Sequence, residues 1–183
     1  MSTLFIDFED SFSFNIIQEV QKLGISPVHT LWNNLPPLEN FDLVILGPGP
    51  GHPNDYEKIF PAIQNYLNTG GRIFGICLGH QIIGCIHGYE IKRCKNPVHG
   101  QSIKLQLDAE VANFLGLAES IEVQRYNSLA VVEKPEDEGM RFTVDDEVLI
   151  FIREGIITYQ FHPESMGTKC RQSYFRPILK YLL

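Results

Sequence analysis

The stretch GICLGHQ, residues 75–81, decides how the rest of the chain is interpreted. It follows the run Arg72 to Phe74, which predicts a buried strand, and precedes an apolar run at 82–86 that is typical of one face of a helix. Cys77 therefore lies where a strand turns sharply into a helix, with a glycine two residues before it and another two residues after it. This is the cysteine form of the nucleophile elbow. The backbone there is strained, and side chains larger than glycine would collide with the strand and the helix.

The elbow also predicts the chemistry of Cys77. A helix that starts directly after it places free N–H groups and a partial positive charge beside the sulfur, which favours the thiolate. The N–H of Leu78 is then placed to donate to an oxyanion. The alternative is a tight strand-to-helix turn with an inert cysteine, since free cysteines are often buried.

A second stretch, YQFHPES at 159–165, supplies partners for the thiol. Pro163 pushes His162 toward an extended backbone, where residues two apart point to the same side, roughly 6.5–7 Å apart. Glu164 can therefore orient the His162 ring, which gives a nucleophile, a base and an orienting acid. Alone, His162 would be interpreted as a core histidine capped by a neighbour. An α/β-hydrolase places the acid before the histidine, and the reverse order here argues against that fold.

Bulk properties narrow the class of protein. The chain has 183 residues, 44% hydrophobic and 20% charged, which predicts a single globular domain over residues 1–183. A net charge of −7 without a basic stripe argues against a nucleic-acid partner. No apolar run has the length of a membrane span, and the N-terminus lacks the features of a signal peptide. Four cysteines without C-x-x-C spacing indicate reduced thiols and a cytoplasmic location.

The first half of the chain alternates strands and helices. The run 42–46 is apolar at every position after Asp42, as in a strand covered on both faces. Asp10 or Ser11 is expected to cap the first helix, and Gly24 to end it. The alternation predicts a doubly wound, mostly parallel sheet flanked by helices, with ligands at the carboxyl ends of the strands. The expected strands are 4–8, 27–32, 42–46 and 72–74, and the expected helices are 11–23, 55–68 and 78–86.

After Gly88 the pattern changes to short strands with short connections. These predict hairpins and an antiparallel addition to the sheet in the C-terminal half, so the fold class is α/β. A closing helix over 171–183 is expected to break or bend near Pro177. The expected strands are 89–94, 102–107, 120–126, 129–133, 140–144, 148–153 and 156–161, with a short helix at 111–115.

The loop GPGPGHP at 47–53 and Gln81 are further candidates for the site. The loop follows a strand, so its N–H groups can face the thiol and complete an oxyanion hole; the alternative is a plain turn. It does not match a phosphate-binding loop. Gln81 lies one helical turn after Cys77, so its amide can reach the same pocket, unless it is a solvated helix residue. The histidines outside 159–165 are scattered without ligand spacing, which argues against a metal site.

Three blocks together resemble a class I (triad) glutamine amidotransferase domain: GICLGHQ at 75–81, GPGPG at 47–51 and QFHPES at 160–165. The resemblance covers nearly the whole chain. Two further blocks narrow it. DFEDSFSFN at 7–15 is similar to a D-N-x-D-S-F-x-x-N start, and RYNSL at 125–129 is similar to R-Y-H-S-L. Both are typical of the glutaminase subunit, component II, of anthranilate synthase and 4-amino-4-deoxychorismate synthase.

The resemblance implies a mechanism without a cofactor. Cys77 would attack the side-chain amide of L-glutamine, His162 would move the proton, and Glu164 would orient His162. Ammonia would pass to a chorismate-using synthase subunit (component I) in a hetero-oligomer. Backbone N–H groups of Leu78 and Gly49 would bind the oxyanion. The positions implied to bind glutamine are Gly49, Pro50, Gly51, Leu78, Gln81, Ser128 and Leu129.

Three positions depart from the family pattern. Phe8 replaces an Asn, Asn127 replaces a His, and Gln101 replaces a Lys in a segment similar to M-H-G-K. None belongs to the triad, so the departures bear on partner docking or on its signalling to the glutaminase site.

Two alternatives remain from other functional classes. One is a Cys hydrolase or peptidase of the DJ-1/PfpI type, against which the late H-P-E segment counts. The other is a catalytically silent, amidotransferase-like binding subunit, against which the intact triad counts. The sequence does not separate anthranilate from aminodeoxychorismate synthesis, because the acceptor chemistry lies on the partner.

Overall fold

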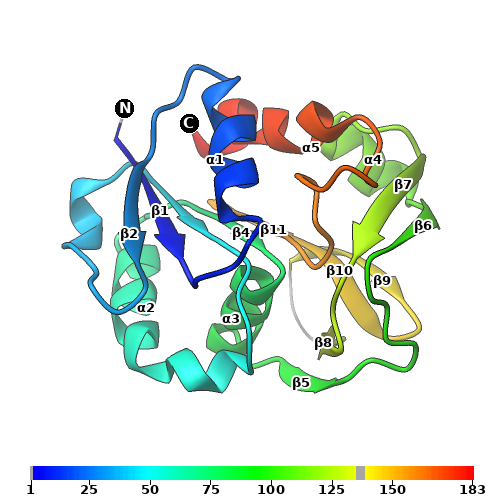
Figure 1. The fold of residues 1–183 in the computed structure, drawn as a ribbon, viewed down its shortest axis with the longest axis horizontal. Helices are drawn as coiled ribbons and strands as arrows, with labels where there is room; N and C mark the ends of the chain where they lie inside the picture. Colours follow the sequence, from blue (N-terminus) through cyan, green and yellow to red (C-terminus); the bar gives the residue numbers. More distant parts are fainter. Residues whose placement is uncertain (1, 135–138) are drawn as a thin grey trace.

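The computed structural model describes residues 2–134 and 139–183. Its described part is built on a nine-stranded sheet in the order β2-β1-β3-β4-β11-β10-β8-β5, with β9 paired to β10 (Figure 1). The strands at one end of this order are parallel, as expected for the first four of them; the fifth, predicted at 156–161 as part of the antiparallel addition, also pairs in parallel, so that part of the prediction is wrong. They are β1 (Thr3–Asp7), β2 (Val28–Leu31), β3 (Leu43–Leu46), β4 (Ile73–Ile76) and β11 (Ile156–Tyr159).

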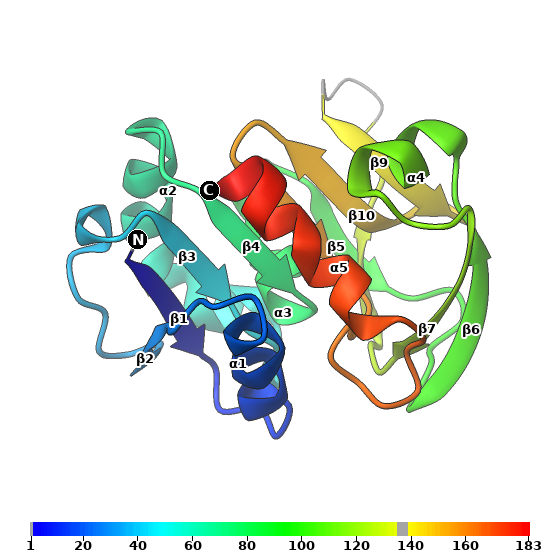
Figure 2. The ribbon, with the colours of Figure 1, turned by 90° about the horizontal axis from the view of Figure 1, so that it is seen from above.

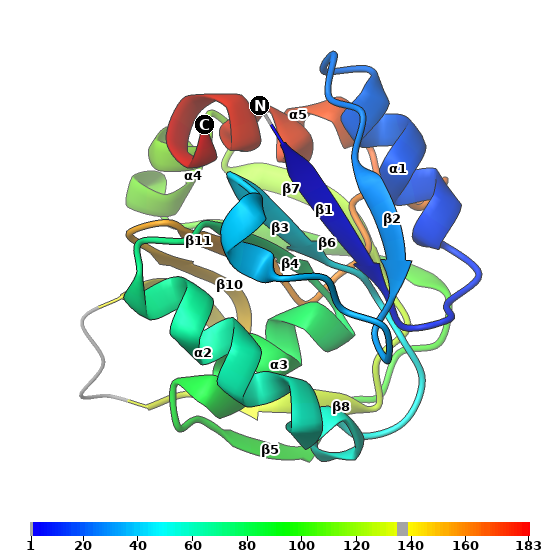
Figure 3. The ribbon, with the colours of Figure 1, turned by 90° about the vertical axis from the view of Figure 1, so that its left-hand side faces the viewer.

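Helices cover both faces of the sheet, which confirms the α/β fold class (Figure 3). Alternate residues of β1 show why: Phe5 packs in one apolar cluster, and Leu4 and Ile6 pack in the other. Such strands bury every position, so they need a helical layer on each side. One layer holds α1 (Ser13–Gln21), α4 (Ala109–Leu115) and α5 (Arg171–Pro177), with α5 crossing the sheet in Figure 2. The other holds α2 (Phe60–Asn68) and α3 (Leu78–Ile86).

The C-terminal half adds antiparallel strands, but not all of them join the sheet. β5 (Glu90–Arg93), β8 (Leu129–Val132), β9 (Met140–Val144) and β10 (Glu147–Arg153) do so, as expected. β6 (Gln101–Gln106) and β7 (Ser120–Arg125) instead form a separate two-stranded ribbon, so that part of the prediction is wrong. Leu105, Ile121 and Val123 of the ribbon are buried against the core, and Ile103 packs there partly buried. One face of the ribbon thus packs against the core, and neither of its strands pairs with an edge of the large sheet.

Helix ends differ from the sequence expectation in detail. Neither Asp10 nor Ser11 caps α1, whose first flanking residue is Phe12; Asp10 Oδ1 instead accepts the Phe12 N–H at 2.8 Å and shapes the turn before the helix. The helix expected from residue 55 begins as a 3-10 helix, η2 (Pro53–Ile59), before α2. A second 3-10 turn, η1 (Leu38–Asn40), precedes β3. At Pro177 the closing helix changes to a π-helix, η3 (Ile178–Leu182), because proline has no N–H to continue the α pattern.

No helix in the described part of the chain combines the length and the apolar character that crossing a bilayer requires.

Candidate active site

The turn from β4 into α3 holds Cys77 in a strained backbone conformation, with φ +52° and ψ −101°. The Cys77 N–H donates to the Tyr159 carbonyl at 2.8 Å, which ties the turn to β11. A Cβ at position 79 would lie 2.3 Å from the Leu46 carbonyl oxygen, and one at position 75 would lie 2.8 Å from a methyl of Thr158. Both flanking positions therefore exclude any larger side chain, since real Cβ contacts are not that short.

His162 reaches the thiol because β11 runs parallel to β4 and ends at the same edge of the sheet. The His162 Nδ1 atom lies 2.7 Å from Glu164 Oε1, and both side chains are buried. A carboxylate at this distance holds the Nδ1–H tautomer and leaves Nε2 for chemistry. The structure therefore places the His162 ring against Glu164 and close enough to Cys77 for the two groups to interact electrostatically.

The charge on His162 depends on its neighbours. Burial alone would lower the pKa of His162, but attraction to the Cys77 thiolate and to Glu164 outweighs burial and raises the pKa well above the ordinary 6.5. Nε2 has no hydrogen-bond partner of regular geometry among the described residues. Its interaction with the sulfur is therefore chiefly an attraction between charges. The arrangement therefore favours a positively charged imidazolium at His162, next to the sulfur of Cys77.

Two glutamines line the thiol on its other side. Gln81 is only 4% exposed, so it is not a solvated helix residue; its Nε2 donates to the Leu129 carbonyl at 3.0 Å and to Gln160 Oε1 at 3.2 Å. Gln160 Nε2 in turn lies 3.8 Å from Cys77 Sγ. Sequence reasoning missed Gln160, although it directly follows β11 and precedes the H-P-E segment.

The glycine–proline loop lies against the elbow. A Cβ at Gly49 would lie 2.5 Å from the Leu78 side chain and 2.4 Å from Phe8 Cβ, so the loop backbone is packed directly on both residues. Leu78 is the first residue of α3, and its N–H has no acceptor in a preceding turn of that helix. The expected oxyanion donors therefore lie on adjoining segments. Pro50 and Gly51 are exposed at the outer end of the loop, where the Pro50 carbonyl accepts the Tyr56 hydroxyl at 3.0 Å.

The segment 127–129 closes the Gln81 side of the site. The Leu129 carbonyl accepts from Gln81, as described, and from Asn127 Nδ2 at 2.9 Å. Ser128 is exposed, and its carbonyl accepts the Cys94 N–H. Leu129 therefore lies beside Gln81, and Ser128 precedes it in the chain.

His162, the predicted base, is held by contacts to Gln124 of the β6–β7 ribbon and to the segment 165–168, which the sequence does not signal. The His162 N–H donates to the Gln124 carbonyl at 2.9 Å. Thr168 is buried, and its hydroxyl donates to the His162 carbonyl at 2.7 Å and accepts the Gln124 N–H at 2.9 Å. The Gln124 side chain also accepts hydrogen bonds from Ser165 and from the Gly167 N–H. We call Gln124, Ser165, Gly167 and Thr168 the base clamp.

Two aromatic rings enclose the imidazole. Tyr126 meets His162 edge-on with centroids 4.9 Å apart, and the Phe12 centroid lies 5.4 Å from that of His162. Phe12 comes from the DFEDSFSFN block and Tyr126 from the RYNSL block. These two blocks therefore meet over the base, although they are far apart in sequence.

Within residues 2–134 and 139–183, no group of three or more His, Cys, Asp or Glu side chains is arranged to hold a metal ion.

Comparison with known proteins identifies the family of the chain. The family model for glutamine amidotransferase class-I matches residues 4–180. Anthranilate synthase component 2 of Saccharolobus solfataricus is 35% identical over 179 residues, covering 91% of each chain. The component 2 of Helicobacter pylori strain 26695 is also 35% identical, covering 92% of this chain and 91% of its own. Aminodeoxychorismate synthase of Streptomyces griseus is 34% identical, but this chain spans only 24% of its length.

Solved structures share the fold at lower identity. A Thermoplasma acidophilum protein, described as a candidate subunit of GMP synthase, has a TM-score of 0.83 at 19% identity, covering 100% of this chain and 94% of its own. A glutamine amidotransferase from Thermotoga maritima has a TM-score of 0.75 at 22% identity, and the match covers 99% of this chain and 82% of the Thermotoga chain. With the family model spanning almost all of the sequence, the chain belongs to the class I glutamine amidotransferases.

Proposed function

We propose that this glutamine amidotransferase is a glutaminase subunit that hydrolyses L-glutamine through Cys77, His162 and Glu164 and supplies ammonia to a chorismate-using synthase. The single observation that carries the proposal is the position of His162. One ring nitrogen lies 2.7 Å from Glu164, and the charge of the Cys77 thiolate helps raise the pKa of the same ring. A base between a nucleophile and an orienting acid is the arrangement that acyl transfer requires.

The steps follow from this geometry. The Cys77 thiolate attacks the side-chain carbonyl carbon of glutamine and forms a tetrahedral adduct. His162 gives its Nε2 proton to the leaving nitrogen, so ammonia departs and a thioester remains. Water, deprotonated by His162, then attacks the thioester carbonyl. The thioester breaks, glutamate is released, and the thiolate–imidazolium pair forms again.

The oxyanion and the substrate are assigned to neighbouring groups. The Leu78 and Gly49 N–H groups would donate to the oxyanion, and loss of one such donor typically costs about 2.7–4 kcal/mol of transition-state stabilisation. Gly49, Pro50, Gly51, Gln81, Ser128 and Leu129 are proposed to bind the polar ends of glutamine. The packing of Gly49 on Leu78 and the shared Leu129 carbonyl support this assignment.

The partner is proposed from the relatives. Two of them are named component 2, which supports a separate synthase subunit for this chain. We propose that residues 1–183 act as one domain in such a hetero-oligomer and make either anthranilate or 4-amino-4-deoxychorismate, as the partner decides. A cytoplasmic location, where thiols stay reduced, suits a mechanism that needs a free Cys77.

The test of the triad uses two cysteines of the same helix region. Cys77→Ser is expected to abolish glutamine hydrolysis and covalent labelling by a diazoketone analogue of glutamine. Cys85→Ser is the matched control and is expected to retain both, because burial raises the pKa of Cys85 to about 11 and keeps it a thiol. Turnover in Cys77→Ser with label on Cys85 would contradict the proposal.

The test of the partner adds a synthase subunit to the purified chain. Glutamine hydrolysis is expected to rise with a chorismate-using subunit, and glutamine plus chorismate should give an aminated product. Full-rate hydrolysis by the chain alone, unchanged by either candidate synthase, would contradict the chorismate link.

A further inference from the structure

A buried ion pair lies behind the glutamine side of the site, away from the triad. Arg125 Nη2 and Glu147 Oε2 are 3.0 Å apart, and the two side chains are only 7% and 9% exposed. Glu147 Oε1 also accepts the Lys95 N–H at 2.8 Å. Ion pairs this deep cost desolvation energy and are weak contributors to stability, so the pair calls for another explanation.

Arg125 is bonded to more than its acidic partner. Its Nε donates to Asn127 Oδ1 at 3.0 Å, which leaves the Asn127 Nδ2 group pointing at the Leu129 carbonyl at 2.9 Å and at Cys94 Sγ at 3.1 Å. Asn127 is 5% exposed, and both ends of its amide are used. The orientation of the amide is therefore fixed by the guanidinium: a flipped amide would place its NH₂ group against a donor.

The hydrogen bonds continue to the thiol. The Leu129 carbonyl also accepts Gln81 Nε2, Gln81 donates to Gln160, and Gln160 Nε2 approaches Cys77 Sγ at 3.8 Å. Apart from Leu129 and Cys77, which are partly buried, every residue in this chain of bonds is less than 10% exposed. In order, these hydrogen bonds link Glu147, Arg125, Asn127, the Leu129 carbonyl, Gln81, Gln160 and the Cys77 sulfur.

Charge balance within the cluster also favours a positioning role. Burial and the nearby Glu147 raise the pKa of Cys94 to about 11, so Cys94 stays a neutral thiol beside Arg125. Glu147 is then the anion that balances the guanidinium. The pair holds a rigid, planar donor group in one place, and a guanidinium can bond a carboxylate and an amide oxygen at the same time.

We propose that the Arg125–Glu147 ion pair is a positioning device for glutamine binding, acting through Asn127 and the Leu129 carbonyl on Gln81 and Gln160. It rests on the proposed function, because it assigns the Gln81 and Leu129 side of the site to glutamine. The pair does not touch the substrate or the reacting sulfur.

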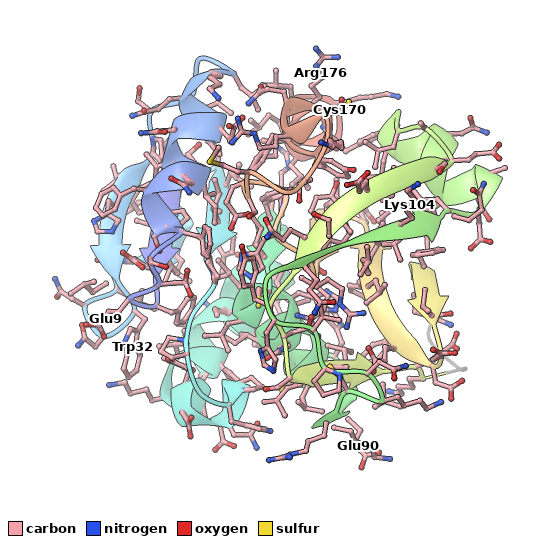
Figure 4. The ribbon with its side chains drawn as sticks, turned by 45° about the vertical axis from the view of Figure 1, so that its right-hand side comes forward. Glu9, Trp32, Glu90, Lys104, Cys170 and Arg176 are labelled. Atoms are coloured by element: carbon pink, nitrogen blue, oxygen red, sulfur yellow. The ribbon has the colours of Figure 1, made fainter. Side chains whose placement is uncertain are left out.

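The first test separates charge from geometry. Arg125→Lys keeps the positive charge beside Glu147 but lacks the planar fork that reaches Asn127 as well. The expected result is a KM for glutamine raised at least fivefold, with kcat within twofold of the wild type. The matched control is Glu90→Gln, which breaks the exposed Lys92–Glu90 pair and should change neither constant. Figure 4 shows Glu90 pointing outward at the edge of the molecule.

The second test asks whether Arg125 acts through Asn127. Asn127→Ala should raise KM as Arg125→Lys does, and the double variant should match Asn127→Ala alone, because the effects of coupled residues do not add. The proposal would be overturned if the KM of the double variant rose by the product of the two single-variant effects. It would also be overturned if folded Arg125→Lys and Asn127→Ala kept the wild-type KM.

A labelling measurement keeps the outcome separate from folding and from the proposed function. In both variants the diazoketone analogue of glutamine should label Cys77 more slowly, while iodoacetamide, which needs no glutamine site, should label it at the wild-type rate. If both reagents labelled Cys77 equally slowly in the variants, the substitutions would have damaged the structure generally, and the proposal would be overturned. A wild-type enzyme without glutaminase activity would instead contradict the proposed function.

Discussion

Cys77 and His162, the proposed nucleophile and the proposed base, are held in place by different means. Cys77 is fixed by the backbone: a strained φ, a helix N-terminus and two glycines packed against Leu46 and Thr158. His162 pairs with Gln124 in an isolated bridge and leads into a turn at residues 163–164, where the sequence predicts an extended backbone; it is fixed by the base clamp and by Glu164. Backbone sterics leave a mark in the sequence, whereas a hydrogen-bond clamp depends on residues that are distant in the chain. The comparison predicts that substitutions around Cys77 abolish most of the activity at once. Substitutions around His162 should lower it by degrees.

The largest effect is expected from Gly79→Ala. The added Cβ would lie 2.3 Å from the Leu46 carbonyl, and backbone cannot give way as a side chain can. We expect a loss of about 1–3 kcal/mol or more in the free energy of unfolding and at least about a hundredfold lower activity from a displaced thiol. Chemical denaturation and glutaminase assays measure the two.

The matched control is Gly84→Ala on the same helix, where the new Cβ would meet only Val131 side-chain atoms, at 2.9 Å. It should cost much less activity. Equal losses in the two variants would remove the case for a sterically fixed elbow.

His80 anchors helix α3, and its environment predicts that the folded protein loses stability in acid. Its Nδ1 lies 2.7 Å from the Thr158 hydroxyl and its Nε2 lies 2.9 Å from the Val148 carbonyl, and burial lowers its pKa from 6.5 to about 4. The unfolded chain therefore binds the proton first, so stability falls as pH drops from about 6.5 to about 4. The difference corresponds to roughly 3 kcal/mol.

His162 has the opposite sign. Its pKa is raised in the folded state, so its contribution is complete below about 6.5 and is lost as pH rises through the folded pKa. The His80 prediction is tested by measuring the free energy of unfolding of the wild type and of His80→Gln from pH 4 to 7. The wild-type value should fall more steeply with decreasing pH than that of His80→Gln. Parallel curves would show that His80 has the same pKa in the folded and the unfolded protein, and would contradict the lowered pKa.

A graded loss is expected from the base clamp. Thr168→Val removes the hydroxyl between the His162 carbonyl and the Gln124 N–H, and leaving these buried groups unpaired should cost about 1–3 kcal/mol. We expect kcat to fall about tenfold through a small shift of His162. Thr168→Ser keeps the hydroxyl and should stay near the wild type in both measurements; a Ser variant as impaired as the Val variant would point to packing as the cause.

The smallest effect is expected from Phe12→Leu. Its ring contacts with His162 and Tyr126 are worth about 0.5–1.5 kcal/mol in typical aromatic pairs, so activity should change by less than about tenfold. Phe14→Leu, two residues further on, is the control, because Phe14 is 64% exposed. A larger loss in Phe14→Leu would show that the outer face of α1 matters more than the ring over the base.

The sequence predicts what local sterics and periodicity determine. The elbow, the parallel strands and the helix layers follow from glycines, apolar runs and one proline. Gln160 and Thr168 were not predicted, because their roles depend on β11 and β7 meeting at the site, which no local pattern encodes. The cap at Asp10 was wrong for a similar reason: the carboxylate bonds within the preceding turn, where tertiary packing places Phe12 over the base.

The insertion of β11 between β4 and β10 has a consequence for synthesis of the chain. Ile73 of β4 pairs with Ile156, 83 residues further on, so β4 stays an unpaired edge until β11 has been made. At about 5–20 residues per second this lasts about 4–17 s on a ribosome. A strand buried on both faces is then open to wrong pairing, and the thiol beside it lacks its base. Under the proposed function, the nascent protein therefore becomes chemically competent only late, when the strand that completes the sheet also brings in the histidine.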